Sequence, residues 1–175
     1  YPGRGLELLE SIARRLPWLT LHVVGNWDTR LDPGTGGSPL PPNVHAHGFL
    51  PYASAEKIRV ACEVLLAPYQ RQVLTHAGAD TSRWMSPLKI FEYMAAGKAI
   101  ICSDIAVLHE VLTHKETAWF CPPDDIEAWC AALTQLRDDE RLRRALGNAA
   151  RETFLRLHTW RARAASVLKS PIEPD

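Results

Sequence analysis

The sequence lacks the features that would place it in a membrane or hold it together by disulfides. No hydrophobic run approaches roughly 18 residues, the length that a membrane-spanning helix needs, and the start carries no signal-peptide pattern. No Cys-x-x-Cys pair occurs among the four cysteines, which are Cys62, Cys102, Cys121 and Cys130. We therefore expect reduced core thiols in a cytoplasmic protein, with neither a disulfide framework nor a zinc site.

The chain also has no excess of positive or negative charge. Twenty Lys and Arg residues balance twenty Asp and Glu residues, so nothing indicates broad electrostatic binding to nucleic acid or to an anionic membrane. The chain does have 175 residues, 46% of them hydrophobic, which is enough for one domain with a buried core. Six tryptophans are many for this length, and we expect some of them at an interface or a ligand.

Short apolar strands alternate with amphipathic helices along the chain. Strands are predicted over residues 19–24, 44–49, 64–68, 99–103 and 118–121. Helices are predicted over 6–16, 54–62, 87–96, 107–112, 126–136, 140–154 and 159–168, the second capped by Ser54 and the fifth by Asp124 or Asp125. This alternation predicts an α/β fold with a doubly wound, Rossmann-like parallel sheet covered by helices on both faces.

Ligands of such folds bind at the carboxyl ends of the strands. Here those ends are Gly25-Asn26, Gly48-Phe49, Pro68-Tyr69 and Ser103-Asp104. His45 and His47 project to one face of the second strand, which could suit a metal. No third ligand is apparent, so the preferred interpretation is a pair that faces solvent or a ligand cleft.

The stretch over residues 86–98 predicts a helix with both ends marked. Ser86 is a good N-cap, Pro87 fits the first helical position, and Gly97 suits the left-handed residue that ends a helix. The expected apolar stripe consists of Leu88, Phe91, Met94 and Ala95.

Two residues of this helix do not fit a purely structural role. Lys89 stands in the first turn, where the helix dipole is positive and a Glu is favoured, and Glu92 interrupts an apolar stretch. A helix start with an added ammonium is a plausible anion site, because free backbone N–H groups converge there. The alternative is a solvated Lys89–Glu92 pair, worth about 0.2–0.5 kcal/mol.

Several stretches of the chain resemble a known enzyme family. Residues 3–9, 22–25, 86–101, 110–112 and 122–125, in this order, resemble the C-terminal half of GT-B glycosyltransferases, and are most similar to the retaining family 4 with its many mannosyl- and glucosyltransferases. The resemblance covers nearly the whole chain. It implies a donor nucleotide-sugar-binding domain over residues 1–168, ending in a helix at about 159–168 that crosses back to the N-terminal domain, and a tail over 169–175.

The same resemblance implies roles for individual residues. Arg4 and Lys89 would neutralise the donor diphosphate, and Glu92 would bind the ribose hydroxyls, so these three form the expected catalytic set. The remaining donor-binding positions that it implies are Gly25, Gly48 and Phe49 near the base and Ser86, Pro87 and Leu88 at the helix start, where backbone N–H groups of Leu88 and Lys89 meet the diphosphate.

The chemistry implied is retaining transfer of a hexose from a donor such as a UDP- or GDP-sugar, in polysaccharide biosynthesis. The main catalytic task is to stabilise the charge that grows on the departing diphosphate. GT-B enzymes do this with Arg, Lys and a helix dipole, so no metal and no cofactor is expected, and no protein nucleophile is named. Whether the parent enzyme associates peripherally with the inner membrane face, as members with lipid-linked acceptors do, stays open.

The chain departs from the family pattern in two places. Trp84 stands eight residues before Glu92, where many members carry a Glu that contacts the sugar, so sugar recognition would fall to backbone groups or to Asp80, Ser82 or Arg83. The strand before the Arg4 loop and the acceptor-binding N-terminal domain are also missing. We therefore expect a fragment of a longer enzyme, inactive alone, whose sheet has a gap or a substituted central strand.

Two alternative functions stay open at this point. One is a GT-B relative such as a sugar-nucleotide epimerase or a phosphorylase. A phosphorylase with pyridoxal phosphate would need a Schiff-base lysine, and Lys89 and Lys98, the lysines near the cleft, lie in no pattern of that kind. The other is a non-catalytic doubly wound module that binds a nucleotide or a protein partner.

Overall fold

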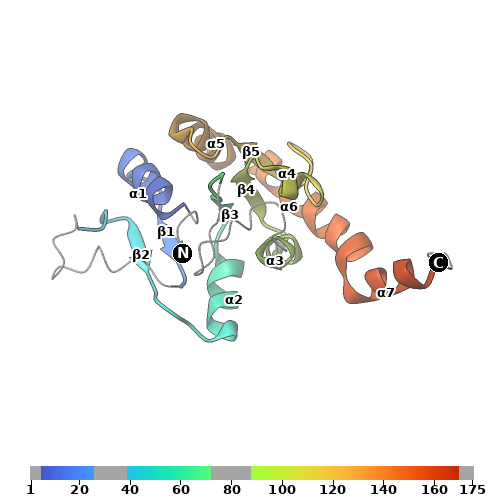
Figure 1. Ribbon diagram of the computed structural model, residues 1–175. Coiled ribbons are helices and arrows are strands. Elements are labelled where there is room, and N and C mark those ends of the chain that lie inside the picture. The colour runs from blue at the N-terminus through green and yellow to red at the C-terminus, as the bar shows by residue number, and fades with distance from the viewer. Residues whose placement is uncertain (1–4, 26–38, 72–87, 170–175) are drawn as a thin grey trace.

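The computed structural model describes residues 5–25, 39–71 and 88–169, and in these ranges helices alternate with short parallel strands (Figure 1). In chain order the elements are α1 (Leu6–Arg15), β1 (Leu21–Val23), β2 (Val44–Ala46), α2 (Tyr52–Ala61), β3 (Val64–Ala67), α3 (Leu88–Ala96), β4 (Ala99–Ser103), α4 (Ala106–His109), β5 (Trp119–Cys121), α5 (Ile126–Asp138), α6 (Glu140–Thr153), the π-helical turn η2 (Phe154–His158) and α7 (Trp160–Lys169). Within these ranges we find no helix whose length and apolarity would let it cross a membrane.

The strands form two parallel sheets instead of one. β1 pairs with β2, in a register that sets Leu21 opposite Val44, and β3, β4 and β5 pair in that order. β1 and β3 are edge strands, and no pairing joins them in the described part of the chain. Figure 1 shows the β1–β2 pair standing apart from β3. The predicted gap in the sheet is therefore observed.

Helices cover both faces of the larger sheet, as the doubly wound prediction requires. All five residues of β4 are buried. Ala99 and Ile101 pack with α1 and α5, whereas Ile100 and Cys102 pack with α3 and α4. This alternation is the period of two that a strand buried on both faces must show.

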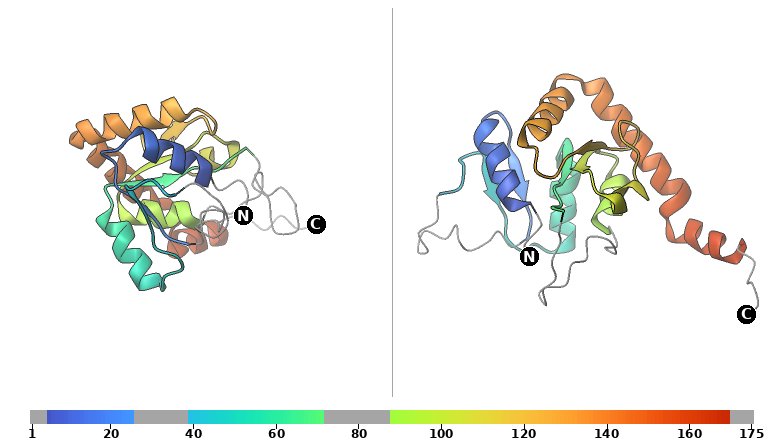
Figure 2. Two further views of the ribbon diagram at one scale, coloured as in Figure 1. Left: turned by 90° about the vertical axis from the view of Figure 1, so that its left-hand side faces the viewer. Right: turned by 45° about the horizontal axis from the view of Figure 1, so that its top comes forward.

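Helix α1 is the element that ties the two sheets together. Its residues Leu8 and Ile12 pack against β4, β5 and α5, and Leu9 and Ala13 pack against β1 and β2. The two views of Figure 2 show α1 lying over the strands from the same side as α5. The smaller sheet therefore has its apolar contacts mainly through one helix.

Aspartate caps start two consecutive helices. The Asp125 carboxylate accepts a hydrogen bond of 3.0 Å from the Ala128 backbone N–H, which settles the choice between Asp124 and Asp125. The Asp139 carboxylate accepts one of 2.8 Å from the Leu142 N–H. Both caps satisfy N–H groups that have no partner inside the helix.

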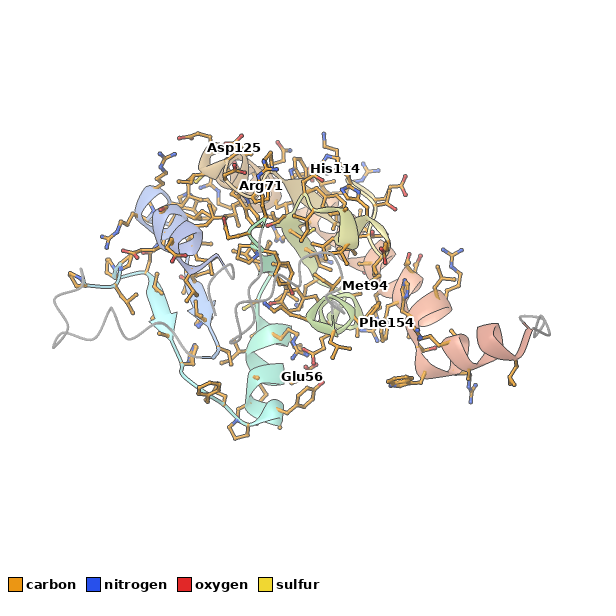
Figure 3. All side chains as sticks on the ribbon, viewed as in Figure 1. Glu56, Arg71, Met94, His114, Asp125 and Phe154 are labelled. Carbon is orange, nitrogen blue, oxygen red and sulfur yellow. The ribbon has the colours of Figure 1, made fainter. Side chains whose placement is uncertain are left out.

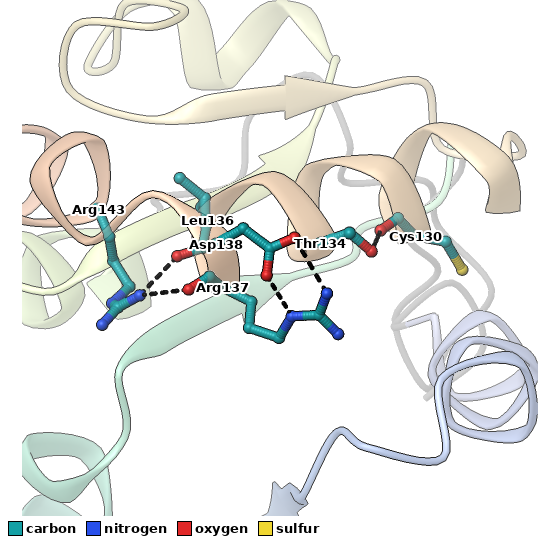
Figure 4. A network of polar contacts seen from close by, with 6 residues as sticks. All are labelled: Cys130, Thr134, Leu136, Arg137, Asp138 and Arg143. Atoms are coloured by element: carbon teal, nitrogen blue, oxygen red, sulfur yellow. Dashed lines mark hydrogen bonds and ion pairs between the residues drawn. The ribbon is translucent and has the colours of Figure 1, made fainter.

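The corner between α5 and α6 is closed by an arginine. Arg143 Nη1 donates to the carbonyl oxygens of Leu136 at 2.6 Å and Arg137 at 3.3 Å, in the network of Figure 4. These carbonyls belong to the last turn of α5, where the chain has no N–H to offer them. Arg143 therefore acts as a side-chain cap at the amino edge of the sheet.

Two details of the helix predictions are wrong. α2 begins at Tyr52 with Pro51 at its N-cap, because the Ser54 N–H already donates to the Pro51 carbonyl. In α3 the buried residues are Ile90 and Met94, while Leu88 is 66% exposed. Ile90 and Met94 are four residues apart and share one face, which packs in the same core cluster as Phe154 (Figure 3).

The cysteines are free thiols, as predicted for reduced core residues, and three of the four are buried. Burial raises the pKa of Cys121 to about 12 and that of Cys102 well above its ordinary value. These thiols are therefore protonated at neutral pH and behave as small apolar side chains.

Candidate functional site

A cavity of about 1090 Å³ lies between the facing edges of β1 and β3. Its walls are the residues of both strands, and its floor includes Leu6 and Leu9 of α1. At the carboxyl ends of the strands it is lined by Gly25, Phe49 and Lys89. This end of a parallel sheet is where ligands of doubly wound folds bind.

Two glycines join the carboxyl ends of β1 and β2. The Gly25 N–H donates a hydrogen bond of 2.7 Å to the Gly48 carbonyl, and the two residues have φ of 118° and 65°. Both values lie in the region that favours glycine. The turn presents Phe49 to solvent, with 84% of its surface exposed. An exposed aromatic ring beside a cavity is available to stack on a planar ligand.

Lys89 lies in the first turn of α3 and is half-buried. Its Nζ is 5.2 Å from the centroid of the Tyr69 ring, a buried side chain that follows β3. A cation over an aromatic face is favourable, so Tyr69 helps to hold the ammonium at the carboxyl edge of the sheet. The positive charge of Lys89 and the positive end of the α3 dipole add at this point.

Glu92 lies one turn further along α3 and forms an ion pair with α2. Its Oε2 is 3.0 Å from Nη2 of Arg59, which also contacts Glu56. Arg59 is a residue that sequence reasoning missed, because nothing in the sequence shows which face of α2 meets α3.

Three imidazoles gather on the exposed face of the smaller sheet. The His22 ring stacks on His45 and His47, with centroids 5.1 and 5.2 Å apart, and its Nδ1 is 2.9 Å from Nε2 of His47. Burial and the two neighbouring imidazoles lower the pKa of His22. The prediction that His45 and His47 share one face is confirmed. His22 joins them on that face because the strand pairing sets it opposite His45. Even so, none of the His, Cys, Asp and Glu side chains in the described ranges is grouped so as to hold a metal ion.

The structure brings some of the predicted site residues together. Gly25, Phe49 and Lys89 line one cavity, and Gly48 is bonded to Gly25. Glu92 does not line that cavity. The predicted positions that lie outside the described residues are Arg4, Ser86 and Pro87, together with Asp80, Ser82, Arg83 and Trp84.

These features define an α/β domain of the doubly wound class. The sheets are parallel, and helices cover both faces of the larger one. Glycines follow β1 and β2, and a basic helix start lies where the cavity between β1 and β3 reaches the carboxyl ends of the strands. A family described as glycosyl transferase-like matches residues 4–169. The chain therefore belongs to the glycosyl transferase-like family.

One relative by sequence agrees with this assignment, and two solved structures share the fold. Phosphatidyl-myo-inositol mannosyltransferase of Mycolicibacterium smegmatis is 30% identical over 164 residues, which cover 94% of this chain and 39% of that protein. Sucrose-phosphate synthase from Thermosynechococcus elongatus superposes with a TM-score of 0.75 at 22% identity, covering 97% of this chain and 42% of the synthase. Anabaena HepE in complex with UDP gives a TM-score of 0.74 at 15% identity, covering 98% and 46%.

The fold is thus the Rossmann-like domain of GT-B glycosyltransferases. The chain spans less than half the length of each of these three relatives.

Proposed function

We propose that this chain is the donor-binding domain of a retaining glycosyltransferase of the family 4 type. In this proposal it binds a nucleoside-diphosphate hexose such as a UDP- or GDP-sugar, and does not transfer the sugar by itself, since the acceptor site belongs to another domain of the parent enzyme. The family match supports glycosyl transfer. One of the structural relatives is a complex with UDP, which is the kind of ligand proposed for this chain.

One observation carries the proposal. The cavity between β1 and β3 reaches the carboxyl edge, where it joins Gly25 and Phe49, proposed to meet the base, to Lys89, proposed to meet the diphosphate. A nucleotide laid along this edge would have its ring beside the exposed Phe49 and its phosphates beside the start of α3. Stacking at one end and charge at the other suit the two halves of a nucleoside diphosphate.

The residues would act mainly on the leaving group. As the bond from the sugar to the diphosphate breaks, negative charge grows on the phosphate oxygens. The Lys89 ammonium, the backbone N–H groups that begin α3 and the Arg4 guanidinium would stabilise that charge. Glu92 does not line the cavity, so the ribose would lie outside it, beside α3, where the exposed part of the Glu92 carboxylate would accept hydrogen bonds from the hydroxyls.

The test is titration calorimetry of the 175-residue chain with UDP and GDP. Lys89→Gln removes one charged hydrogen bond to phosphate, worth about 1.5–3 kcal/mol, so affinity should fall roughly tenfold to a hundredfold. Lys98→Gln is the matched control, because Lys98 follows α3 at the amino end of β4 and should not matter. An equal loss in both variants, or no binding by the unaltered chain, would refute the proposal.

A further inference from the structure

Arg59 lies between two carboxylates that belong to two different helices. On α2 it contacts Glu56, which is labelled in Figure 3, and across to α3 its Nη2 is 3.0 Å from Glu92 Oε2. Its guanidinium carbon is also 5.7 Å from the centroid of the Tyr52 ring. Only 11% of the Arg59 side chain is exposed, so it is the most enclosed member of the cluster.

This cluster is a principal link between α2 and the rest of the domain. No residue of α2 is buried, so the helix has little apolar contact to hold it. Burial lowers the pKa of Arg59, but Tyr52 and the charges of Glu92 and Glu56 outweigh this effect and raise it overall. The guanidinium is therefore charged at any working pH and keeps its planar set of donors in place.

The ion pair leaves Glu92 open on one side. Arg59 approaches one carboxylate oxygen, while 41% of the Glu92 side chain remains exposed. An ionised carboxylate offers about four lone-pair positions, so one arginine does not exhaust it. A free glutamate would lose side-chain entropy on binding a ligand, whereas one already held by an enclosed arginine has lost it in advance.

We propose that Arg59 is a positioning residue that holds the Glu92 carboxylate in the orientation in which it accepts hydrogen bonds from ribose hydroxyls. This inference rests on the proposed function, because it takes the ligand to be a nucleotide with a ribose at Glu92. Arg59 itself does not touch the ligand. Its effect is therefore confined to the part of the binding energy that depends on the hydroxyls.

The experiment compares ribonucleotides with their 2′-deoxy counterparts. The 175-residue chain is titrated with UDP, GDP and ADP and with 2′-deoxy-UDP, 2′-deoxy-GDP and 2′-deoxy-ADP. The unaltered chain should prefer the ribose form of the nucleotide that binds it by about tenfold or more, the worth of one hydrogen bond to a charged group. Arg59→Ala should reduce this preference to below about threefold and leave the deoxy affinity nearly unchanged, and Arg59→Lys should restore part of it.

Two further measurements separate positioning from a structural role. Melting temperatures are recorded for every variant, and Arg144→Ala serves as the matched control, because Arg144 forms an exposed ion pair with Glu140 on α6. If Arg59→Ala keeps the ribose preference, or weakens ribose and deoxyribose ligands equally while the melting temperature falls, the inference is wrong. If the unaltered chain binds none of the six nucleotides, the proposed function itself is wrong, whatever the role of Arg59.

Discussion

The His45 and His47 imidazoles, on which the His22 ring stacks, disfavour the charged form of His22. A hydrogen bond between His22 Nδ1 and His47 Nε2 needs one nitrogen to carry a proton and the other to be bare. When both rings are protonated, both nitrogens become donors and the bond is lost. As cations, His45 and His47 would also repel a protonated His22, since their ring centroids lie 5.1 and 5.2 Å from that of His22. The smaller sheet therefore carries a local sensitivity to acid.

We expect the free energy of unfolding to fall as the pH drops below the ordinary value of 6.5. The folded-state pKa of His22 is lower than that of the unfolded chain, mainly through burial and then through His45 and His47. Between the two values the unfolded chain binds more protons, so acid favours unfolding. His114 and His158 have lowered pKa values, also mainly through burial, and act in the same direction.

Urea unfolding at about pH 7.5 and about pH 5.5 measures this dependence. His22→Asn should shrink the difference between the two unfolding free energies, and the remainder should come from His114 and His158. An unchanged difference would mean that the stack has no energetic consequence.

At the scale of single residues, the sequence predicts a role best where the backbone restricts the choice. Gly25, Gly48 and Gly97 were assigned to strand and helix ends, and all three have positive φ. Arg59 and His22 could not be assigned, because their importance comes from contacts across elements. The register that sets His22 opposite His45 depends on strand pairing, and a sequence does not show pairing directly.

Between elements, α6 makes a very close approach to the turn after α3. Gly147 of α6 is buried, and a Cβ built on it would lie 2.4 Å from the carbonyl oxygen of Gly97. Gly97 itself ends α3 with φ of 66°. The helix can therefore lie directly on this backbone only because position 147 has no side chain.

Gly147→Ala should destabilise the fold by about 1–3 kcal/mol, although alanine is the better helix former. The added methyl group would push α6 away from α3 and β4, which share the core with Leu146 and Ala150. Urea unfolding measures the cost. The matched control is Asn148→Ala, one residue on and exposed, which should leave stability unchanged or slightly raise it. If Gly147→Ala left the free energy of unfolding unchanged, α6 would be able to shift without cost.

The strands and most helices could be predicted because the larger sheet is buried on both faces. β4 has the bounds expected from its apolar run over 99–103. β1 and β2 are shorter than predicted, since they lie in a small sheet with one exposed face and one pairing partner each. The start of α2 was misplaced because Pro51 supplies an N-cap without a side-chain hydrogen bond, which a search for Ser, Thr or Asp overlooks.

In the molecule as a whole, contacts are distributed unevenly. The β3–β4–β5 sheet is held by helices on both faces, whereas the β1–β2 pair depends on α1. At the other end, α7 extends from the body (Figures 1 and 2), and Trp160 at its start is 87% exposed. An exposed tryptophan on a projecting helix is available for a partner surface. Because the β1–β2 pair depends mainly on α1 for its apolar contacts, we expect this pair to open first.

Amide hydrogen exchange should therefore divide the molecule into two units. Amides of β4 are expected to exchange slowest, and those of β1 and β2 to exchange through local opening that leaves β4 closed. Leu9→Ala removes an apolar contact of the smaller sheet at a cost of about 2–5 kcal/mol, and should speed exchange in β1 and β2 while β4 stays protected. Leu133→Ala, in the cluster of the larger sheet, should instead speed exchange in β4 as well. Equal loss of protection in both sheets after Leu9→Ala would mean that α1 couples them into one cooperative unit. In that case the unpaired edges of β1 and β3 would not allow the smaller sheet to open by itself.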